Sequence, residues 1–454
     1  MIEQDHRPKL HFTPPFGWIN DPNGMVHIEG NYHLFYQYFP DGLTWGPMHW
    51  GHAVSRDFIE WKHLPTALYP DELGMIFSGS CVYDVNNTSE FGKDGHKPIA
   101  AIFTNHHEVS GTEVQSIAYS LDGIHFEKYY GNPVITEPSL KDFRDPKAFW
   151  NPINNCWSLV LAANDRVKFY RSDNLKLWSK TGDFVVGGNG VFGICECPDC
   201  FPVKTECGIK WVLIISMIIP VDDERKQVHK TQYFIGQFDG DTFVDTERSD
   251  DPLWLNCGPD HYAGVTFQNL DKPVMIGWAN NWKYACDTPA TDYRGQMTLA
   301  TEIKLKNTAL GWRVAMTPLG LEAYKTKELY VNSGVKFKSN AFGVNVRGAD
   351  NEKIIFSNEE GEEICIEVTN SEIIVDRTKS GKKVFHPLYD FYGKTIAKRF
   401  SYKDFELKII FDVSLLEIFA DDGLISITMS VYPDNPYSTL KFDGDSKVEL
   451  YYFN

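Results

Sequence analysis

The hydrophobic positions of this chain come in short runs, and few of them recur at helical spacing. Apolar and aromatic runs of strand length lie at residues 33–38, 99–103, 157–161, 211–215 and 273–277. Clusters of Gly, Pro, Asn, Asp and Ser separate these runs at short intervals, as turns separate the strands of antiparallel sheets. The pattern predicts an all-β protein.

A short turn signature recurs along the first half of the chain. In each copy an Asp or Asn stands four positions before an aromatic residue, and the anchors are Asp57, Asp122, Asn174 and Asp239. A repeat of that spacing has room for several strands per unit, which is typical of the blades of a β-propeller. Chance recurrence of a common turn is the alternative.

The strand pattern changes near residue 317, where a connector-like stretch begins. Alternating runs of strand length follow it at 353–356, 365–368, 372–375, 407–411, 416–419 and 426–430. Strands of this kind predict a β-sandwich. The expected domains are therefore a propeller at 1–316, a linker at 317–335 and a sandwich at 336–454.

Composition and charge narrow the class of partner. The net charge of −17 argues against nucleic acid and anionic membranes, because both require a basic surface. Aromatic residues make up 14% of the chain, which suits strands and equally suits sugar binding. The most apolar window, 211–220, has the length of a strand, and the polar start does not resemble a signal peptide. A cytoplasmic location is expected, or secretion if a leader has been removed, and a homo-oligomer is compatible with the sequence.

The nine cysteines are scattered and odd in number, which favours reduced thiols over a disulfide framework. Four of them, Cys195, Cys197, Cys200 and Cys207, are clustered. Their spacing is not that of a standard zinc site, so no metal and no other cofactor is expected.

Three acidic residues stand in unusual settings. Asp21 lies in a Pro- and Gly-rich turn, and Asp145 lies between Arg144 and Pro146, where the arginine is expected to hold it ionised. Glu196 lies between two cysteines, and poor solvation there is expected to raise its pKa. One ionised carboxylate and one protonated carboxylic acid are what glycoside hydrolysis requires. Ordinary solvated loop carboxylates are the alternative.

The motifs around these acids resemble those of glycoside hydrolase family 32, the β-fructofuranosidases. The opening sequence Trp-Ile-Asn-Asp-Pro-Asn-Gly at 18–24 is similar to the first family motif. Arg-Asp-Pro at 144–146 and Glu-Cys-Pro at 196–198 are similar to two others. Further similarities occur in the family's order, at residues 35–38, 45–52, 77–80, 294–299 and 416–423.

This resemblance implies a five-bladed propeller followed by a β-sandwich, and it implies roles for individual residues. Asp21 is expected to be the nucleophile, Glu196 the acid/base, and Asp145 with Arg144 the group that holds fructose hydroxyls and stabilises the transition state. The residues expected to line the fructose pocket or its rim are Asn20, Gln37, Trp45, Phe77, Ser78 and Tyr293.

Several positions depart from the family pattern. Residues 256–259 read Asn-Cys-Gly-Pro where many members have Asp-Tyr-Gly followed by a basic residue, although Asp260 and Tyr262 still fit. Tyr293 replaces a frequent Trp, and Ala-Thr-Glu at 300–302 replaces Pro-Arg-Glu. These departures concern the leaving-group side, and the overall match is closer to levanases and inulinases than to sucrose-phosphate hydrolases.

The function expected from these observations is hydrolysis of terminal β-D-fructofuranosyl residues of sucrose and fructans, with retention of configuration. A fructosyltransferase on the same scaffold is one alternative, since it shares the covalent intermediate. A non-catalytic sugar-binding propeller is the other.

Overall fold

The computed structural model describes residues 6–186, 191–221, 228–247, 249, 251–331, 334–349, 351–400 and 404–453. The chain divides into two compact units. The first, here called the propeller unit, comprises Pro14–Leu255 and Tyr262–Trp278. The second, the sandwich unit, comprises Met1–Thr13, Asn256–His261 and Ala279–Asn454. The fold class is all-β, a five-bladed β-propeller followed by a β-sandwich, as the sequence predicts.

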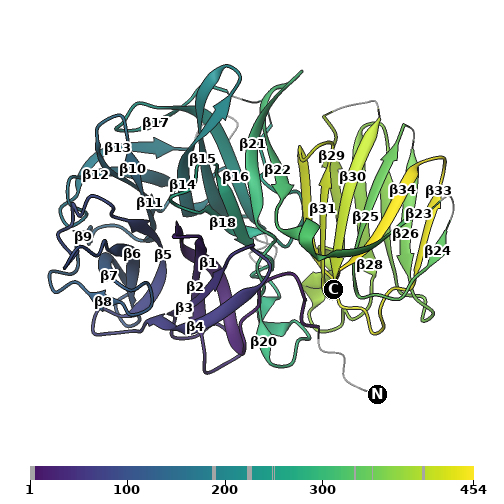
Figure 1. The fold of residues 1–454 in the computed structure, drawn as a ribbon, viewed down its shortest axis with the longest axis horizontal. Helices are drawn as coiled ribbons and strands as arrows, with labels where there is room; N and C mark the ends of the chain where they lie inside the picture. The colour runs from purple at the N-terminus through teal and green to yellow at the C-terminus, as the bar shows by residue number, and fades with distance from the viewer. Residues whose placement is uncertain are drawn as a thin grey trace. The chain divides into compact units, whose positions relative to one another are not determined.

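The propeller unit consists of antiparallel sheets whose strands follow one another in chain order (Figure 1). Four sheets contain β1–β4, β5–β9, β10–β13 and β14–β17, and a fifth begins with β18 and β19. The bounds are β1 (Gly17–Ile28), β2 (Asn31–Phe39), β3 (His49–Ser55), β4 (Trp61–Leu68), β5 (Met75–Tyr83), β6 (Ile99–His107), β7 (Thr112–Ser120), β8 (Glu127–Lys128), β9 (Ile135–Thr136), β10 (Phe143–Asn151), β11 (Cys156–Ala163), β12 (Arg166–Ser172), β13 (Ser179–Val185), β14 (Ile194–Thr205), β15 (Gly208–Ile219), β16 (Val228–Phe238), β17 (Phe243–Asp245), β18 (Tyr262–Thr266) and β19 (Val274–Trp278).

The recurring turn signature of the sequence marks equivalent turns in four of these sheets. The carboxylate of Asp57 accepts hydrogen bonds from the backbone N–H groups of Ile59 and Glu60, both at 2.9 Å, just before β4. Asp122, Asn174 and Asp239 accept the same pair of bonds from the residues two and three positions further on. Such side-chain caps stabilise a tight turn locally, which is why the turn can be recognised from sequence.

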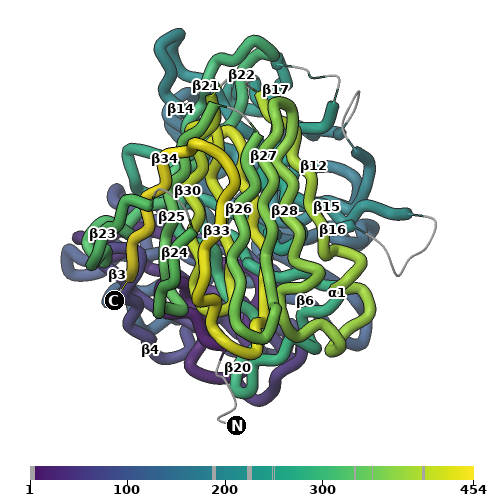
Figure 2. The backbone as a smooth tube through the Cα atoms, turned by 90° about the vertical axis from the view of Figure 1, so that its right-hand side faces the viewer, coloured from purple at the N-terminus to yellow at the C-terminus, as the bar shows by residue number. Residues whose placement is uncertain are grey.

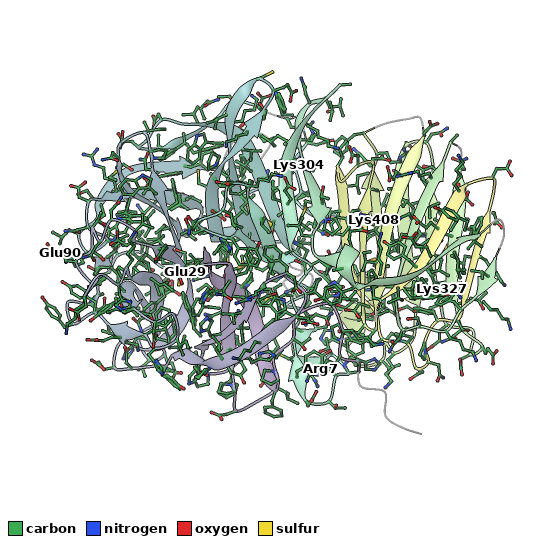
Figure 3. The ribbon with its side chains drawn as sticks, viewed as in Figure 1. Arg7, Glu29, Glu90, Lys304, Lys327 and Lys408 are labelled. Carbon is green, nitrogen blue, oxygen red and sulfur yellow. The ribbon has the colours of Figure 1, made fainter. Side chains whose placement is uncertain are left out.

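The core of the propeller unit lies between neighbouring sheets. Apolar side chains of β10 and β11 pack against those of β14 and β15, and their other face packs against β5–β7. Phe149 and Leu213 belong to the first of these clusters, and Ile102 and Leu159 to the second. Polar side chains therefore remain available at the ends of the strands. Glu90, in the loop after β5, is exposed at the outer side of this unit (Figure 3).

The sandwich unit contains two six-stranded sheets, in the orders β23-β34-β25-β30-β31-β32 and β24-β33-β26-β27-β28-β29. Figure 2 shows the second sheet face on. The elements are η2 (Ala285–Asp287), β20 (Tyr293–Arg294), β21 (Thr301–Thr308), β22 (Gly311–Pro318), η3 (Leu321–Tyr324), β23 (Lys325–Val331), β24 (Val335–Lys336), β25 (Ala341–Gly348), β26 (Glu352–Ser357), β27 (Glu363–Val368), β28 (Glu372–Lys379), α1 (Pro387–Phe391), β29 (Lys394–Lys398), β30 (Phe405–Asp412), β31 (Leu415–Ala420), β32 (Ile425–Ser430), β33 (Thr439–Asp443) and β34 (Lys447–Phe453).

Apolar and polar side chains alternate along the strands of the sandwich, and the apolar ones form its core. In β27, Ile364 and Ile366 are fully buried between the two sheets, while Glu363 and Glu367 lie on the outer face. The stretch predicted as a linker, 317–335, includes η3 and β23, and β23 pairs with β34. The predicted domain boundaries stay a prediction. Among the described residues, no helix is long and apolar enough to span a membrane.

Two isoleucines of the same sheet test how far the sandwich depends on this core. Ile366 is fully buried and Ile396 is 58% exposed. We expect Ile366→Ala to lower the free energy of unfolding by about 2–5 kcal/mol, because it leaves a cavity. Ile396→Ala is the matched control, with a loss below about 1 kcal/mol. Urea-induced unfolding of both variants measures the difference, and equal losses would contradict the assigned core.

Candidate active site

The first strand of each sheet in the propeller unit has the same irregularity. In every case the pairing with the second strand shifts, which is the signature of a β-bulge, and in β1 it shifts a second time, between Asn23 and Val26. The shifts fall between Ile19 and Pro22 in β1, Ile76 and Gly79 in β5, Arg144 and Lys147 in β10, Glu196 and Asp199 in β14, and Tyr262 and Val265 in β18. Seven of the predicted site residues lie in or beside these bulges, namely Asn20, Asp21, Phe77, Ser78, Arg144, Asp145 and Glu196. Gln37, Trp45 and Tyr293 lie elsewhere, on β2, in the loop after it and on β20.

Asp21 lies in the bulge of β1 and is partly exposed. Its Oδ1 accepts a hydrogen bond from Asn20 Nδ2 at 3.0 Å, and its Oδ2 accepts one from Ser78 Oγ at 2.5 Å. The thiol of Cys197 lies 3.4 Å from the same Oδ2. Asn20 is itself oriented by the Trp18 indole, whose Nε1 donates to Asn20 Oδ1 at 2.8 Å. The structure therefore brings together residues of β1, β5 and β14 around one carboxylate.

Asp145 lies in the bulge of β10 and is 6% exposed. Its Oδ2 accepts the backbone N–H of Cys197 at 2.9 Å, and its own N–H donates to Thr104 Oγ1 at 3.0 Å. Burial raises the pKa of Asp145 to about 8, the charges of Asp21 and Glu196 add to the rise, and Arg144 opposes it. The expectation that the adjacent arginine holds Asp145 ionised is therefore wrong, because desolvation outweighs the arginine.

Glu196 lies beside the bulge of β14, with its side chain 17% exposed. Its Oε1 accepts hydrogen bonds from Arg144 Nε at 3.3 Å and Nη2 at 3.1 Å, and its Oε2 accepts one from the Tyr262 hydroxyl at 2.6 Å. Burial raises the pKa of Glu196 against the lowering effects of Arg144 and Tyr262, and the charge of Asp21 adds to the rise. The direction of this shift agrees with the prediction from sequence.

Arg144 is the cation of this cluster. Besides Glu196, its Nη1 donates to Glu113 Oε1 at 3.1 Å and to Asp142 Oδ1 at 2.8 Å. Glu113 also accepts the backbone N–H of Phe143 at 2.6 Å and lies 3.1 Å from His106 Nδ1. Burial acts to raise the pKa of Glu113, but His106 and Arg144 together hold it below its usual range. The guanidinium is thus fixed from several sides.

Glu113 and His106 were not predicted from the sequence. Both lie in the β6–β7 hairpin, where they are register partners. The sequence shows only a histidine near the end of one strand-length run and a glutamate near the start of the next. Their relation to the site appears only once β7 is paired with β6 and the Glu113 carboxylate contacts Arg144 on β10.

Two of the aromatic residues predicted for the pocket, Phe77 and Trp45, lie next to each other. Phe77, in the bulge of β5, stacks on His106 with ring centroids 4.5 Å apart. Trp45 is 42% exposed, and its ring centroid is 6.1 Å from that of Phe77. Gln37 is buried, and its Nε2 donates to Asn23 Oδ1 at 2.9 Å and to the Ile76 carbonyl at 3.0 Å. Gln37 thereby ties β1 to β5.

Two residues that depart from the family pattern belong to the sandwich unit. The Tyr293 hydroxyl donates to the His6 carbonyl at 2.8 Å, and the Arg7 guanidinium lies 4.3 Å from the centre of its ring. Asn256 Nδ2 donates to the hydroxyls of Ser426 and Thr428, both at 2.9 Å. Each has a local structural partner, and the predicted role of Tyr293 at the sugar site stays a prediction.

Asp21, Asp145 and Cys197 each offer a ligand atom within 4.8 Å of one another. The predicted cysteine cluster is not such a group among the residues that the structure describes: Cys195 and Cys200 belong to the hydrophobic core, and Cys207 is exposed. The three close groups are two carboxyls and a thiol whose pKa burial raises well above its usual value. A thiol kept protonated is a poor metal ligand, and its S–H is suited to donate to the two carboxyls.

The arrangement can hold two carboxyl groups in different protonation states. The carboxyl of Glu196 keeps a proton to higher pH than a free glutamate, while Asp21 faces partly outward and accepts three hydrogen bonds. An acid and a nucleophile side by side suit acyl or glycosyl transfer, and the abundance of hydroxyl- and amide-binding groups favours a sugar.

Comparison with known proteins agrees with this chemistry. The model of the glycosyl hydrolases family 32 N-terminal domain matches residues 11–315, and that of the family 32 C-terminal domain matches residues 295–451. A levanase of Bacillus subtilis is 40% identical, over 98% of this chain and 70% of its own length. An extracellular exo-inulinase of Aspergillus niger is 34% identical, over 95% of this chain and 90% of its own length.

Solved structures are similar over the whole chain. The crystal structure of an exo-inulinase from Aspergillus awamori has a TM-score of 0.91 and 30% identity, and the similarity covers 100% of this chain and 99% of that one. A fructofuranosidase from Schwanniomyces occidentalis, complexed with fructose, has a TM-score of 0.89 and 28% identity, with 100% and 99% covered.

The proximity of the carboxyl groups makes a prediction about their titration. Asp21→Asn removes a negative charge that disfavours ionisation of its neighbours, so we expect the pKa values of both Asp145 and Glu196 to fall. Carbon-13 NMR of labelled carboxyl groups measures both titrations. Asp122→Asn, a surface change in the same unit, is the control and leaves them unaltered. Unchanged pKa values in Asp21→Asn would show that the three groups are not coupled.

Proposed function

The chain belongs to glycoside hydrolase family 32, and on that premise we propose the following function and the following roles for individual residues. The protein is a β-fructofuranosidase that hydrolyses terminal β-D-fructofuranosyl residues of sucrose and fructans, with retention of configuration. The observation that carries the proposal is the placement of Asp21 and Glu196 in one cluster, where burial raises the pKa of Glu196.

In the first step Asp21 acts as the nucleophile. One of its carboxylate oxygens bonds to the anomeric C2 of the fructosyl unit, and the bond from C2 to the leaving oxygen breaks. Ser78 and Asn20 hold the carboxylate by the hydrogen bonds described above, which fixes its direction of attack. Glu196 gives its proton to the leaving oxygen, so that an alcohol rather than an alkoxide departs.

In the second step Glu196 acts as a base. Its carboxylate takes a proton from water, the water oxygen bonds to C2, and the bond from C2 to Asp21 breaks. Arg144 and Tyr262 stabilise the carboxylate form of Glu196 that exists between the two steps. The same residue therefore needs a pKa that is raised enough to hold a proton and restrained enough to lose it.

Asp145 is proposed to bind fructose hydroxyls. Because burial raises its pKa to about 8, it holds a proton near neutral pH and can donate as well as accept a hydrogen bond. Asn20, Gln37 and Ser78 supply further amide and hydroxyl groups, and Trp45 and Phe77 supply an apolar wall for the sugar ring. Arg144 is proposed to orient Glu196, since its guanidinium contacts that carboxylate.

Substitution of the two carboxyl groups separates their roles. We expect Glu196→Gln to lower kcat/KM on sucrose roughly 100- to 10,000-fold, because kcat/KM reports the first step, in which proton donation is lost. On β-D-fructofuranosyl fluoride, whose leaving group departs without a proton, the loss is much smaller. Asp21→Asn is expected to lose activity on both substrates, because attack on C2 is lost.

Steady-state kinetics on the two substrates measures these effects, with circular dichroism to confirm that each variant is folded. Equal losses of Glu196→Gln on sucrose and on the fluoride would contradict its role as the acid. Near-normal release of fructose by Asp21→Asn would contradict its role as the nucleophile.

The hydrogen bond from Tyr262 to Glu196 predicts a shift in the pH profile. That bond lowers the pKa of Glu196, so its loss in Tyr262→Phe raises the pKa and keeps the acid protonated to higher pH. The alkaline limb of kcat/KM on sucrose is therefore expected to move to higher pH. Tyr170→Phe, at a buried tyrosine on β12, is the control, and its alkaline limb is expected to stay in place. A limb that stays in place or moves to lower pH would contradict the assignment.

A further inference from the structure

A concave site lies in the propeller unit, away from the carboxyl cluster. It is a cavity of about 240 Å³, and its walls include Tyr83, Val85, Asn86, Trp150, Trp157 and Gln268. None of the residues that line it carries a charge. It belongs to a single compact unit, and the residues proposed above for catalysis do not line it.

The strand order fixes where this cavity lies relative to the active site. Tyr83 stands five residues after Ser78 on β5, and Trp150 stands five residues after Asp145 on β10. At a rise of about 3.3 Å per residue, both aromatic residues lie roughly 16 Å along the strand from the catalytic end. Gln268 follows β18 in the same sense. The cavity is therefore at the opposite end of the same first strands.

The walls of the cavity are held rigidly. The fully buried Asp84 accepts the backbone N–H of Thr88 at 2.9 Å and that of Ser89 at 2.8 Å, which closes the loop after β5. Trp157 Nε1 donates to Thr88 Oγ1 at 2.7 Å and ties this loop to β11. On the other side of the cavity, the backbone N–H of Gln268 donates a hydrogen bond to the Met25 carbonyl at 2.9 Å. This bond fixes the backbone from which the Gln268 side chain projects. A preformed cavity loses little entropy when a ligand binds.

Two polar groups of the cavity wall are bonded to protein, because Trp157 Nε1 donates to Thr88 and Asn269 Nδ2 donates to the His27 carbonyl at 2.7 Å, whereas four others have no such partner in the part of the chain that the structure describes. Among the described residues, no hydrogen bond is made by the Tyr83 hydroxyl, the Trp150 Nε1 or the side-chain amides of Asn86 and Gln268. Beside them is an aromatic surface, since the rings of Trp150 and Trp157 are 5.0 Å apart and nearly perpendicular. The cavity thus offers neutral donors and acceptors next to apolar ring surface.

This combination selects the chemistry of the ligand. An ion is disfavoured, because no charge in the wall compensates its desolvation. A purely apolar ligand would leave the amides and the hydroxyl unpaired. A sugar unit has hydroxyls for the amides and C–H faces for the aromatic rings. We propose that this cavity is a non-catalytic subsite that binds one saccharide unit of a neutral polysaccharide.

The ligand is identified as a fructosyl unit within a fructan, and that identification rests on the proposed function. The subsite would hold a polymer on the enzyme while its chain end reaches the active site. Sucrose is too short to occupy both places at once. The subsite therefore affects the binding of fructans and does not affect the binding or hydrolysis of sucrose.

The test uses the full chain with Asp21→Asn, so that binding is measured without turnover. We expect the double change Asn86→Ala and Gln268→Ala to weaken binding of levan by at least about tenfold, which corresponds to about 1.4 kcal/mol. Trp150→Ala is expected to do the same. Tyr130→Ala, at an aromatic residue of the same unit that is 95% exposed, is the matched control and leaves levan binding unaltered. Titration calorimetry and gel retardation in levan measure the binding.

The same variants in the active chain give the second readout. With Asp21 restored, kcat/KM on sucrose is expected to stay within about twofold while KM for levan rises, because only the polymer uses the subsite. Should both cavity variants bind levan as tightly as the control, the proposal is overturned. Trp150→Ala alone is not decisive if it impairs folding, and the double amide variant then decides.

Failure of the proposed function gives a different result. If the parent chain released no fructose and the cavity variants still lost affinity for levan, the subsite would stand and the hydrolase would not. Dextran serves as the second neutral polymer in the calorimetry. Equal binding of dextran and levan would overturn the fructan assignment while leaving a general saccharide subsite.

Discussion

The bulges in the first strands of the propeller sheets are the constraint on which the active site depends. A regular strand points neighbouring side chains to opposite faces, whereas a bulge turns two successive residues out of that alternation. Asp145 and Cys197 adopt positive φ angles of 64° and 44° to make this possible. Non-glycine residues in that region cost on the order of 1–3 kcal/mol each. The hydrogen bonds of Asp145 to Thr104 and to the Cys197 backbone offset this cost and lock the two bulges together.

The connected bulges bring together more carboxyl groups than the nearby cationic side chains can neutralise. Arg144 contacts three carboxyl groups, while Asp145 and Asp21 lie close to a thiol that burial keeps protonated. The raised pKa values of Asp145 and Glu196 follow first from burial and then from that imbalance. The acid proposed for glycoside cleavage is therefore a consequence of burial and of crowding, and the arginine limits the shift by stabilising the ionised form.

Local features of the fold could be predicted from sequence, and features that depend on pairing could not. The Asp57 turn is recognisable because a side chain caps its own neighbours, and the sandwich core follows from alternation along strands such as β27. The motifs predicted Asp21 and Glu196 as site residues, but not Glu113, whose place in the cluster depends on the pairing of β6 with β7 and on the contact with Arg144. The ionisation of Asp145 was predicted wrongly because its burial, which outweighs the charge of Arg144, cannot be read from the neighbouring residues in the sequence. The hydrogen bonds of the Arg144 guanidinium go to other carboxyl groups, including Glu196 and Glu113.

The same geometry that builds one site at one end of the first strands leaves room for another at the other end. In β5 and β10 the bulge near the start is followed by a regular strand, which carries Tyr83 and Trp150 a fixed distance from the carboxyl cluster. The apolar middle of these strands is used for packing between sheets, so chemistry is confined to their two ends. An enzyme that removes single units from a long polymer gains from a second contact, because the effective concentration of the chain end rises without any change in the catalytic groups.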